Sequence, residues 1–211
     1  MDFDAFIPFA LRLKDVPLPG EKSHYKMAPS IRKKEIEALP LEARNPRKAA
    51  VMALFYPDEA RATRLLLTMR KQYNGVHSGQ IGFPGGKLET EDSGYESAAL
   101  RETYEEVGVA PDRIEVFKRL SDIYIPPSNY MVRPFMGLIR KRPLFRPQDT
   151  EVEQVIEVLL SDFLDDSAVH DEILDTSYAK NIRTPVFKLN GYTVWGATAM
   201  ILSEVKELLK A

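Results

Sequence analysis

The sequence predicts an α+β fold in which helices pack as layers on a β-sheet. Apolar runs of strand length recur along the chain, separated by clusters of turn residues. Apolar residues at helical spacing lie at 2–14, near the start of the chain, and at 197–210, near its end. Helices and half-apolar strands each need a partner layer for their apolar face, so strands between an early and a late helix favour a layered α+β architecture.

The composition indicates one globular domain, or one domain with an extension. The chain has 211 residues, of which 44% are hydrophobic and 28% charged, an ordinary balance for a protein with a core. Its net charge of -2 argues against a sequence-independent nucleic-acid binder, which would carry a basic stripe. A nucleotide substrate stays compatible, because a local basic pocket needs only a few side chains. The absence of cysteine excludes a disulfide framework, a thiolate metal site and a cysteine nucleophile.

Signals for secretion and for membrane insertion are not apparent in the sequence. The first residues lack a basic stretch followed by an apolar run, which a signal peptide requires. No segment approaches the roughly 20 apolar residues of a membrane-spanning helix. We therefore expect a cytoplasmic protein without a membrane partner.

Residues 1–47 are expected to form an extension ahead of a domain at residues 48–211. The predicted helix at 2–14 ends at two prolines and a glycine. The charged stretch 21–47 is interrupted by further prolines, so we expect it to follow the surface with one short helix near 31–38. The sequence leaves open whether this extension contributes to a homodimer or to the wall of a pocket.

The remaining elements are justified by short apolar runs between turn residues. Strands are predicted, in chain order, at residues 49–56, 63–70, 114–125, 130–139, 152–159, 172–175 and 185–189. Turns are predicted at residues 57–59, 126–129 and 190–191, a glycine-rich loop with a short strand at 75–86, and a helical turn at 161–164. Trp195 and Tyr192, near the last helix, are expected in the core or at its rim.

The most informative segment is a predicted helix at residues 94–107, with Gly108 as its C-cap. Glu102 precedes Glu105 and Glu106 by three and four positions, so the three carboxylates project from one side. Their mutual repulsion destabilises the helix unless a cation offsets it. Mg²⁺ takes oxygen ligands and usually binds through one or two carboxylates plus substrate phosphates. The segment therefore indicates metal-assisted chemistry on a phosphorylated substrate. The alternative, a solvated row of glutamates, is disfavoured by the Pro-Gly-Gly turn that precedes the helix.

This segment resembles the Nudix box, the signature of the Nudix hydrolases. The match covers the pairs Arg101-Glu102 and Glu105-Glu106, followed by Gly108 and Val109. Two departures are visible. Thr103 stands where the family has an aliphatic residue, and the gap between Gly86 and Arg101 is one residue longer than usual, with Asp92 where a glutamate is expected. We expect Asp92 to be a helix N-cap rather than a metal ligand.

The longer gap resembles one branch of the family, the coenzyme A pyrophosphatases. The preceding sequence is similar to the same branch, with Leu66-Leu67-Thr68-Met69-Arg70 and then His77-Ser78-Gly79-Gln80-Ile81-Gly82-Phe83-Pro84-Gly85-Gly86. The resemblance implies a Nudix-type α/β/α sandwich around a mixed β-sheet. It also implies cleavage of the diphosphate of coenzyme A or its derivatives, giving adenosine 3′,5′-bisphosphate and 4′-phosphopantetheine, with Mg²⁺ or Mn²⁺ as cofactor.

Two alternatives stay open beside this hypothesis. The substrate could be another nucleoside diphosphate derivative, such as ADP-ribose, or a nucleoside triphosphate. The chain could also be a regulatory module that binds a nucleotide without hydrolysing it, although such a module has no need of three glutamates.

The resemblance assigns roles to individual residues. The metal ligands are predicted to be Glu102, Glu105, Glu106 and Gly86, the last through its backbone carbonyl. Arg101 is predicted to orient and neutralise a ligand carboxylate. The general base is predicted to be Glu105, or one of two residues outside the box, Glu151 and Glu153, which could equally be a surface alternation.

Substrate contacts are predicted from the branch-specific segment. His77, Ser78, Gln80 and Phe83 are expected to contact substrate or to support the loop that does so. Arg70, at the end of a strand, is either a phosphate clamp or part of a surface ion pair.

Overall fold

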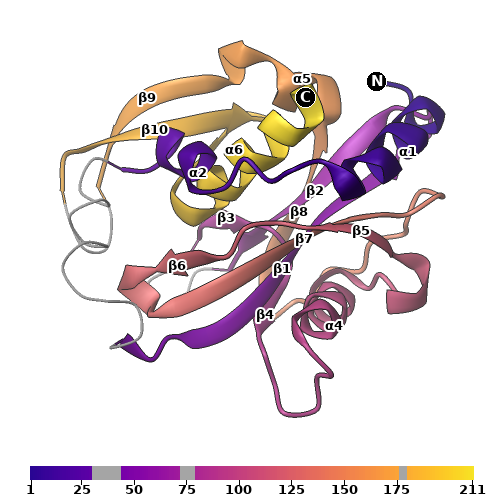
Figure 1. Ribbon diagram of the computed structural model, residues 1–211, viewed down its shortest axis with the longest axis horizontal. Coiled ribbons are helices and arrows are strands. Elements are labelled where there is room, and N and C mark those ends of the chain that lie inside the picture. The colour runs from indigo at the N-terminus through magenta and orange to yellow at the C-terminus, as the bar shows by residue number, and fades with distance from the viewer. Residues whose placement is uncertain (30–43, 72–78, 176–179) are drawn as a thin grey trace.

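The structure is a computed structural model that describes residues 1–29, 44–71, 79–175 and 180–211 (Figure 1). In these ranges it contains an eight-stranded mixed sheet and a three-stranded antiparallel sheet, with helices packed on the larger one. The predicted α+β class is confirmed. No helix in the described part of the chain combines the length and the apolar character that crossing a membrane requires.

Strand β1 (Arg47–Pro57) lies at the centre of the larger sheet. It pairs in parallel with β7 (Tyr130–Leu138) and antiparallel with β2 (Thr63–Arg70) and β4 (Gly85–Lys87). The other strands of this sheet are β3 (Ile81–Gly82), β5 (Glu115–Arg119), β6 (Ile123–Ile125) and β8 (Val152–Leu159). The smaller sheet consists of β9 (Val169–Leu174), β10 (Ile182–Leu189) and β11 (Tyr192–Val194).

The apolar run in β1 is continuous because both faces of this strand are buried. Ala53 and Phe55 belong to one core cluster, whereas Met52 and Leu54 belong to the other. Successive side chains of a strand point to opposite faces, so β1 divides the core into two layers.

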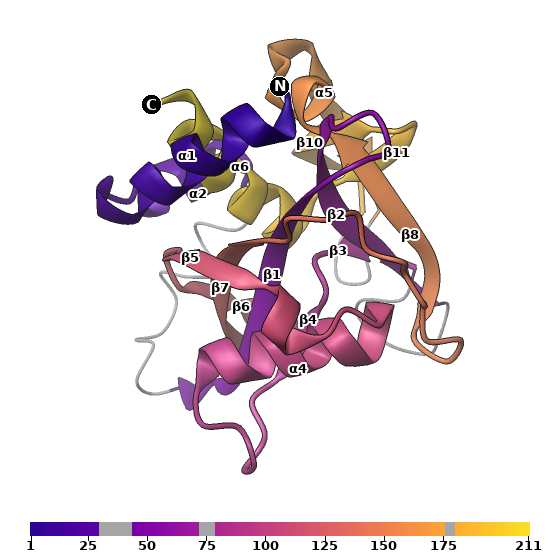
Figure 2. The same ribbon diagram turned by 90° about the vertical axis from the view of Figure 1, so that its right-hand side faces the viewer.

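Helices cover both layers and complete the predicted α/β/α sandwich. Helix α4 (Tyr95–Val107) packs on the face that carries Met52. Helices α1 (Phe3–Arg12), α2 (Glu21–Lys26) and α6 (Gly196–Lys210) lie on the opposite face, as Figure 2 shows. A short helix, α5 (Leu160–Leu164), follows β8, and short 3-10 turns precede β5, β7 and β9.

The first helices of the chain are part of the main core. Phe3 and Phe6 are fully buried, and the ring of Phe6 lies 5.0 Å from that of Phe55. His24 in α2 is bonded to Glu204 in α6 through Nε2 and Oε2, 3.0 Å apart. The N-terminal segment is thus joined to the sheet by aromatic packing and to the last helix by a buried polar contact.

Several predicted elements differ from the observed ones in a physically simple way. The expected strand 114–125 is divided into β5 and β6, which both pair with β7, and between them the N–H of Leu120 still donates to the carbonyl of Pro134. Strand β11 was not predicted, since its three residues are too few for a periodicity signal. The helix expected near 31–38 lies outside the described residues.

Candidate active site

The Pro-Gly-Gly turn brings three elements into close contact. In β4, Gly85 pairs with Val51 and Gly86 with Ala50 on β1. A Cβ atom on Gly85 would lie 2.3 Å from the carbonyl oxygen of Ala50, and one on Gly86 would lie 2.3 Å from Oε1 of Glu102. Glycine at both positions therefore lets β4 lie directly against β1 and against the glutamate face of α4.

Helix α4, which carries the three glutamates, is capped by Gly94 at its start and by Gly108 at its end. The hydroxyl of Ser97 accepts the N–H of Gly94 at 3.0 Å, and Gly108 adopts a left-handed φ of +75°. The predicted C-cap is thus confirmed. Thr103, at the position that is aliphatic in the Nudix box, is fully buried, and its hydroxyl donates to Ala99 at 2.6 Å. Because this bond lies within the helix, a buried threonine fits there without an unpaired hydroxyl.

The predicted N-cap role of Asp92 is wrong. Gly94 is the N-cap, and the carboxylate of Asp92 instead accepts the N–H of Glu89 at 2.9 Å. The same carboxylate accepts Nε and Nη2 of Arg101 at 3.1 and 3.0 Å, with only 4% of the Asp92 side chain exposed. The hydrogen bonds from Arg101 lower the pKa of Asp92. Asp92 therefore holds Arg101 in place as a buried, two-pronged ion pair.

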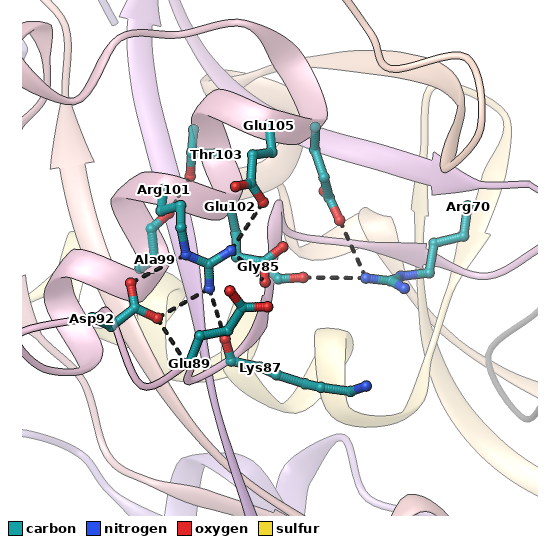
Figure 3. Close-up of polar contacts among 11 residues, drawn as sticks. Arg70, Gly85, Lys87, Glu89, Asp92, Ala99, Arg101, Glu102, Thr103 and Glu105 are labelled. Atoms are coloured by element: carbon teal, nitrogen blue, oxygen red, sulfur yellow. Dashed lines mark hydrogen bonds and ion pairs between the residues drawn. The ribbon is translucent and has the colours of Figure 1, made fainter.

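Arg101 connects three parts of the site: Asp92 in the segment between β4 and α4, strand β4 itself, and two of the box glutamates. Figure 3 shows its guanidinium between Asp92 on one side and Glu105 on the other. Nη1 lies 2.9 Å from Glu105 and 3.2 Å from Glu102, and Nη2 donates to the carbonyl of Lys87 at 2.9 Å. Hydrogen bonding to Asp92, above all, raises the pKa of Arg101, so this residue is a permanent cation beside the glutamates.

Glu106 is the most buried of the three box glutamates. Only 4% of its side chain is exposed, against 49% for Glu105, and Oε1 lies 3.2 Å from Nη2 of Arg70. Burial raises the pKa of Glu106 to about 7, since the opposing attraction of Arg70 is partly cancelled by repulsion from Glu102 and Glu151. The ionised form of Glu106 is therefore costly in the absence of a further cation.

Glu102 and Glu151 belong to the same electrostatic cluster. Burial raises the pKa of Glu102, Arg101 opposes this shift, and repulsion from Glu105 and Glu151 adds to it. Glu151 comes from the turn before β8 and lines a cavity beside Glu102. Glu153 on β8 is exposed, as Glu151 is, but it is not among the residues that line this cavity. The two residues differ because Glu151 precedes the strand and does not follow its alternation.

A cavity of about 530 Å³ borders this cluster, and Glu106 is not among the residues that line it. Its lining includes Gly86, Glu102, Glu105 and Glu151, and also the predicted substrate residues Arg70, Gln80 and Phe83. The two other residues predicted to contact substrate, His77 and Ser78, lie outside the described residues. Trp195 lines the cavity as well, and the sequence placed it only in the core or at its rim.

The donor chemistry of the cluster fits a hard divalent cation, although the side chains are paired with arginines. Within the described ranges, no group of three or more acidic or histidine side chains is arranged to hold a metal ion. Glu106 forms an ion pair with Arg70, and Glu105 forms one with Arg101. Mg²⁺ and Mn²⁺ prefer oxygen donors, and the cluster offers carboxylate oxygens beside a glycine backbone. Such a cation would also offset the repulsion between glutamates that helps to raise the pKa of Glu106.

Comparison with known proteins identifies the family. A family model described as NUDIX domain matches residues 46–176. The chain is 32% identical over 164 residues to chloroplastic Nudix hydrolase 22 of Arabidopsis thaliana, covering 74% of this chain and 53% of the relative. The chain thus spans about half the length of that relative. It is 28% identical over 169 residues to peroxisomal coenzyme A diphosphatase ndx-8 of Caenorhabditis elegans, covering 79% and 70%.

A solved structure supports the fold. The MutT/nudix family protein from Enterococcus faecalis matches with a TM-score of 0.53 at 18% identity, covering 85% of this chain and 68% of that one. The three-layer arrangement, the glutamate helix behind its glycine turn and the match over more than half of the residues agree with one another. The chain belongs to the Nudix hydrolase family.

Proposed function

We propose that this protein is a metal-dependent pyrophosphohydrolase that cleaves the diphosphate of coenzyme A or its derivatives. The products would be adenosine 3′,5′-bisphosphate and 4′-phosphopantetheine. One observation supports the hydrolase function most strongly: Glu102, Glu106 and Glu151 repel one another, and Glu102 and Glu151 line one cavity together with Gly86. The choice of coenzyme A rests on the segment from Leu66 to Gly86 and on the similarity to a coenzyme A diphosphatase.

The ligands that would hold Mg²⁺ or Mn²⁺ are Glu102, Glu106, Glu105 and the carbonyl oxygen of Gly86. When bound, such an ion neutralises the charge of the diphosphate and makes a coordinated water more acidic. Arg101 holds Glu102 and Glu105 in position, because it is itself fixed by Asp92 and by the carbonyl of Lys87. Arg70 and Lys87 both line the cavity, and Arg70 is the one that we propose as a contact for a phosphate oxygen.

A carboxylate must accept the proton of the attacking water. Glu151 is the better candidate of the two outside the box, because it lines the cavity and Glu153 does not. Glu105 is the candidate within the box, but its carboxylate is already bound to Nη1 of Arg101, 2.9 Å away. We therefore assign the general base to Glu151, with Glu105 holding Arg101 and the metal ligands together.

A panel of diphosphates tests the proposed function. Coenzyme A, 3′-dephospho-coenzyme A, ADP-ribose and a nucleoside triphosphate are compared with Mg²⁺, with Mn²⁺ and with a chelator. We expect metal-dependent release of 4′-phosphopantetheine, with a higher kcat/KM for coenzyme A than for the other compounds. A higher value for ADP-ribose or the triphosphate would contradict the substrate. Tight nucleotide binding without turnover of any compound would instead favour a regulatory module.

Cellular location and assembly remain predictions. The relatives named above are described as chloroplastic and peroxisomal, so the cytoplasmic location needs a direct test such as fractionation. The predicted homodimer is tested by the molar mass of the protein in solution.

A further inference from the structure

The cavity extends well beyond the carboxylate cluster, and its charge is confined to one side. Among the described residues that line it, every charged side chain comes from β2, from β4 and the loop after it, from α4, or from the turn before β8. These elements surround the proposed site of the diphosphate. The other side of the cavity is formed by two elements that supply no charged lining residue.

We call this second side the uncharged wall. The β6–β7 hairpin contributes Ile125, Pro127, Ser128, Tyr130 and Val132. The first turns of α6 and the residue before them contribute Trp195, Gly196, Ala197, Thr198 and Ile201. The wall therefore combines aliphatic and aromatic surface with three neutral hydroxyl groups, those of Ser128, Tyr130 and Thr198.

The two halves of the uncharged wall are held at a fixed separation. Thr198 donates to the carbonyl of Ile81 at 2.9 Å, which fixes the start of α6 against β3. Further along α6, Glu204 accepts both the hydroxyl and the N–H of Ser121, at 2.6 and 3.2 Å. Ser121 lies two residues before β6, so the same helix is bonded close to the hairpin. A wall built in this way keeps its shape without a ligand.

We propose that the uncharged wall binds the pantetheine arm of the substrate, including an acyl group on its sulfur, and that the 3′-phosphorylated adenosine lies toward the charged side. This inference rests on the proposed function, which places the diphosphate at the carboxylate cluster. A group covalently attached to that diphosphate must occupy the rest of the same cavity. The pantetheine arm has amides, methyl groups and a thiol but no charge, so it suits neutral and apolar surroundings. The dianionic 3′-phosphate would lose its hydration there without a counterion.

One cation behind the wall makes the opposite orientation testable. Arg47 does not line the cavity; it donates to the carbonyl of Ser128 at 2.7 Å, and its guanidinium lies 4.2 Å from the ring centre of Tyr130. If the hairpin side received the nucleotide, Arg47 would be the group to pair with the 3′-phosphate. If it receives the pantetheine arm, Arg47 only supports the hairpin from outside.

The test fills the wall and measures each product separately. Ala197→Leu adds bulk at a partly buried position in the first turn of α6, where leucine is a good helix former. Ala60→Leu makes the same change in the exposed turn between β1 and β2 and is the control. Binding of 4′-phosphopantetheine and of adenosine 3′,5′-bisphosphate is measured by calorimetry with Mg²⁺, beside kcat and KM for coenzyme A and acetyl-coenzyme A.

We expect Ala197→Leu to weaken the binding of 4′-phosphopantetheine by about 10-fold or more. This is the usual effect of a mismatch of a few methylene groups in an apolar pocket. The affinity of Ala197→Leu for adenosine 3′,5′-bisphosphate should change by less than about 2-fold. In Ala60→Leu and in Arg47→Ala, the affinities for both products should change as little. Ile125→Ala, which removes wall surface instead of filling the cavity, should weaken the same product if Ala197→Leu does not fold.

The contrary results are distinct. Suppose that Ala197→Leu or Arg47→Ala selectively loses binding of adenosine 3′,5′-bisphosphate. The substrate would then lie in the opposite orientation, which overturns this inference but leaves the proposed function standing. Unchanged binding of both products in Ala197→Leu and Ile125→Ala would also overturn it. A wild-type protein that cleaves other diphosphates but not coenzyme A overturns the proposed function, and this assignment with it.

Discussion

Nη2 of Arg70 lies 3.2 Å from Oε1 of Glu106, and the same nitrogen donates to the carbonyl oxygen of Gly85 at 3.1 Å. A carboxylate and a backbone carbonyl beside each other are the donors that a divalent cation takes. Arg70 therefore occupies the position of a counterion to the buried glutamate. The ion pair with Glu106 and the proposed contact with a phosphate are therefore compatible. Arg70 would make the first in the free protein and the second when substrate is bound.

The first prediction is that Arg70→Gln binds metal more tightly but processes substrate less well. Removing the guanidinium removes a competitor for Glu106, so Mn²⁺ affinity without substrate should rise severalfold. Loss of a phosphate contact should lower kcat/KM for coenzyme A by about 10-fold or more. Calorimetric titration at about pH 9 keeps protons from competing for Glu106. Arg64→Gln is the matched control, since Arg64 on the same strand pairs with Asp58. Weaker Mn²⁺ binding in Arg70→Gln would contradict the prediction.

The second prediction concerns Glu106→Gln. Turnover should fall by about 100-fold or more, because a charged ligand is lost. The metal-free melting temperature should stay the same or rise slightly, since burial and repulsion already disfavour the ionised form. Glu102→Gln should behave alike. A clear fall in the metal-free melting temperature would indicate a structural role, and a wild-type rate at saturating Mg²⁺ would remove Glu106 from the metal site.

The third prediction uses two glutamates two residues apart. Glu151→Gln should lower kcat by about 100-fold or more, as expected for loss of a general base. Glu153→Gln should leave kcat within about 2-fold, because Glu153 does not line the cavity. Steady-state kinetics at saturating metal and substrate decide the matter. Equal losses in both variants, or a loss confined to Glu153→Gln, would move the base elsewhere.

The fourth prediction concerns Asp92, which fixes Arg101. Asp92→Asn should destabilise the protein by about 1–3 kcal/mol, because the mostly buried guanidinium loses a charged partner. It should lower kcat more than it changes KM, since Arg101 then holds Glu102 and Glu105 less firmly. Asp92→Glu restores the charge and the residue typical of the family, and it should recover most of the activity. If Asp92→Glu is as impaired as Asp92→Asn, charge at this position is not what positions Arg101.

The fifth prediction is a pH dependence of stability that involves Glu204. Burial would raise the pKa of Glu204, but hydrogen bonds from His24 and Ser121 outweigh it, so the pKa is lowered on folding. The resulting stabilisation is present above the unfolded pKa of about 4.3 and is lost as the pH falls through the lower folded value. Glu204→Gln should therefore cost about 1–3 kcal/mol at neutral pH. Urea unfolding from neutral to acidic pH should show the difference from wild type shrinking as the pH falls. A constant difference would exclude this linkage.

The sequence predicted the local parts of the fold and site well, because they depend on spacing within one element. Helical spacing placed Glu102, Glu105 and Glu106 on one helix beside the glycine turn. It did not separate the last two, although neighbouring helical positions differ by about 100° in direction, which buries Glu106 and exposes Glu105.

Contacts between distant segments could not be predicted in this way. Asp92 binds Arg101 across the turn that precedes α4. From the neighbouring sequence alone, its carboxylate was therefore predicted to be a helix cap. The uncharged wall comes from residues near 130 and near 197 that carry no distinctive chemistry and have meaning only once they share a cavity. Cooperation of this kind depends on tertiary packing, which overrides local propensity.

The carboxylate of Glu204 also constrains the order in which the molecule can be completed. Its partner His24 precedes it by 180 positions, and Ser121 precedes it by 83. During synthesis on the ribosome, both partners emerge long before the acceptor that they share. The ring of His24 and the hydroxyl of Ser121 therefore lack this acceptor until α6 has left the exit tunnel. The final closure of the core is thus a step that follows translation of α6 and cannot accompany translation of the N-terminal helices.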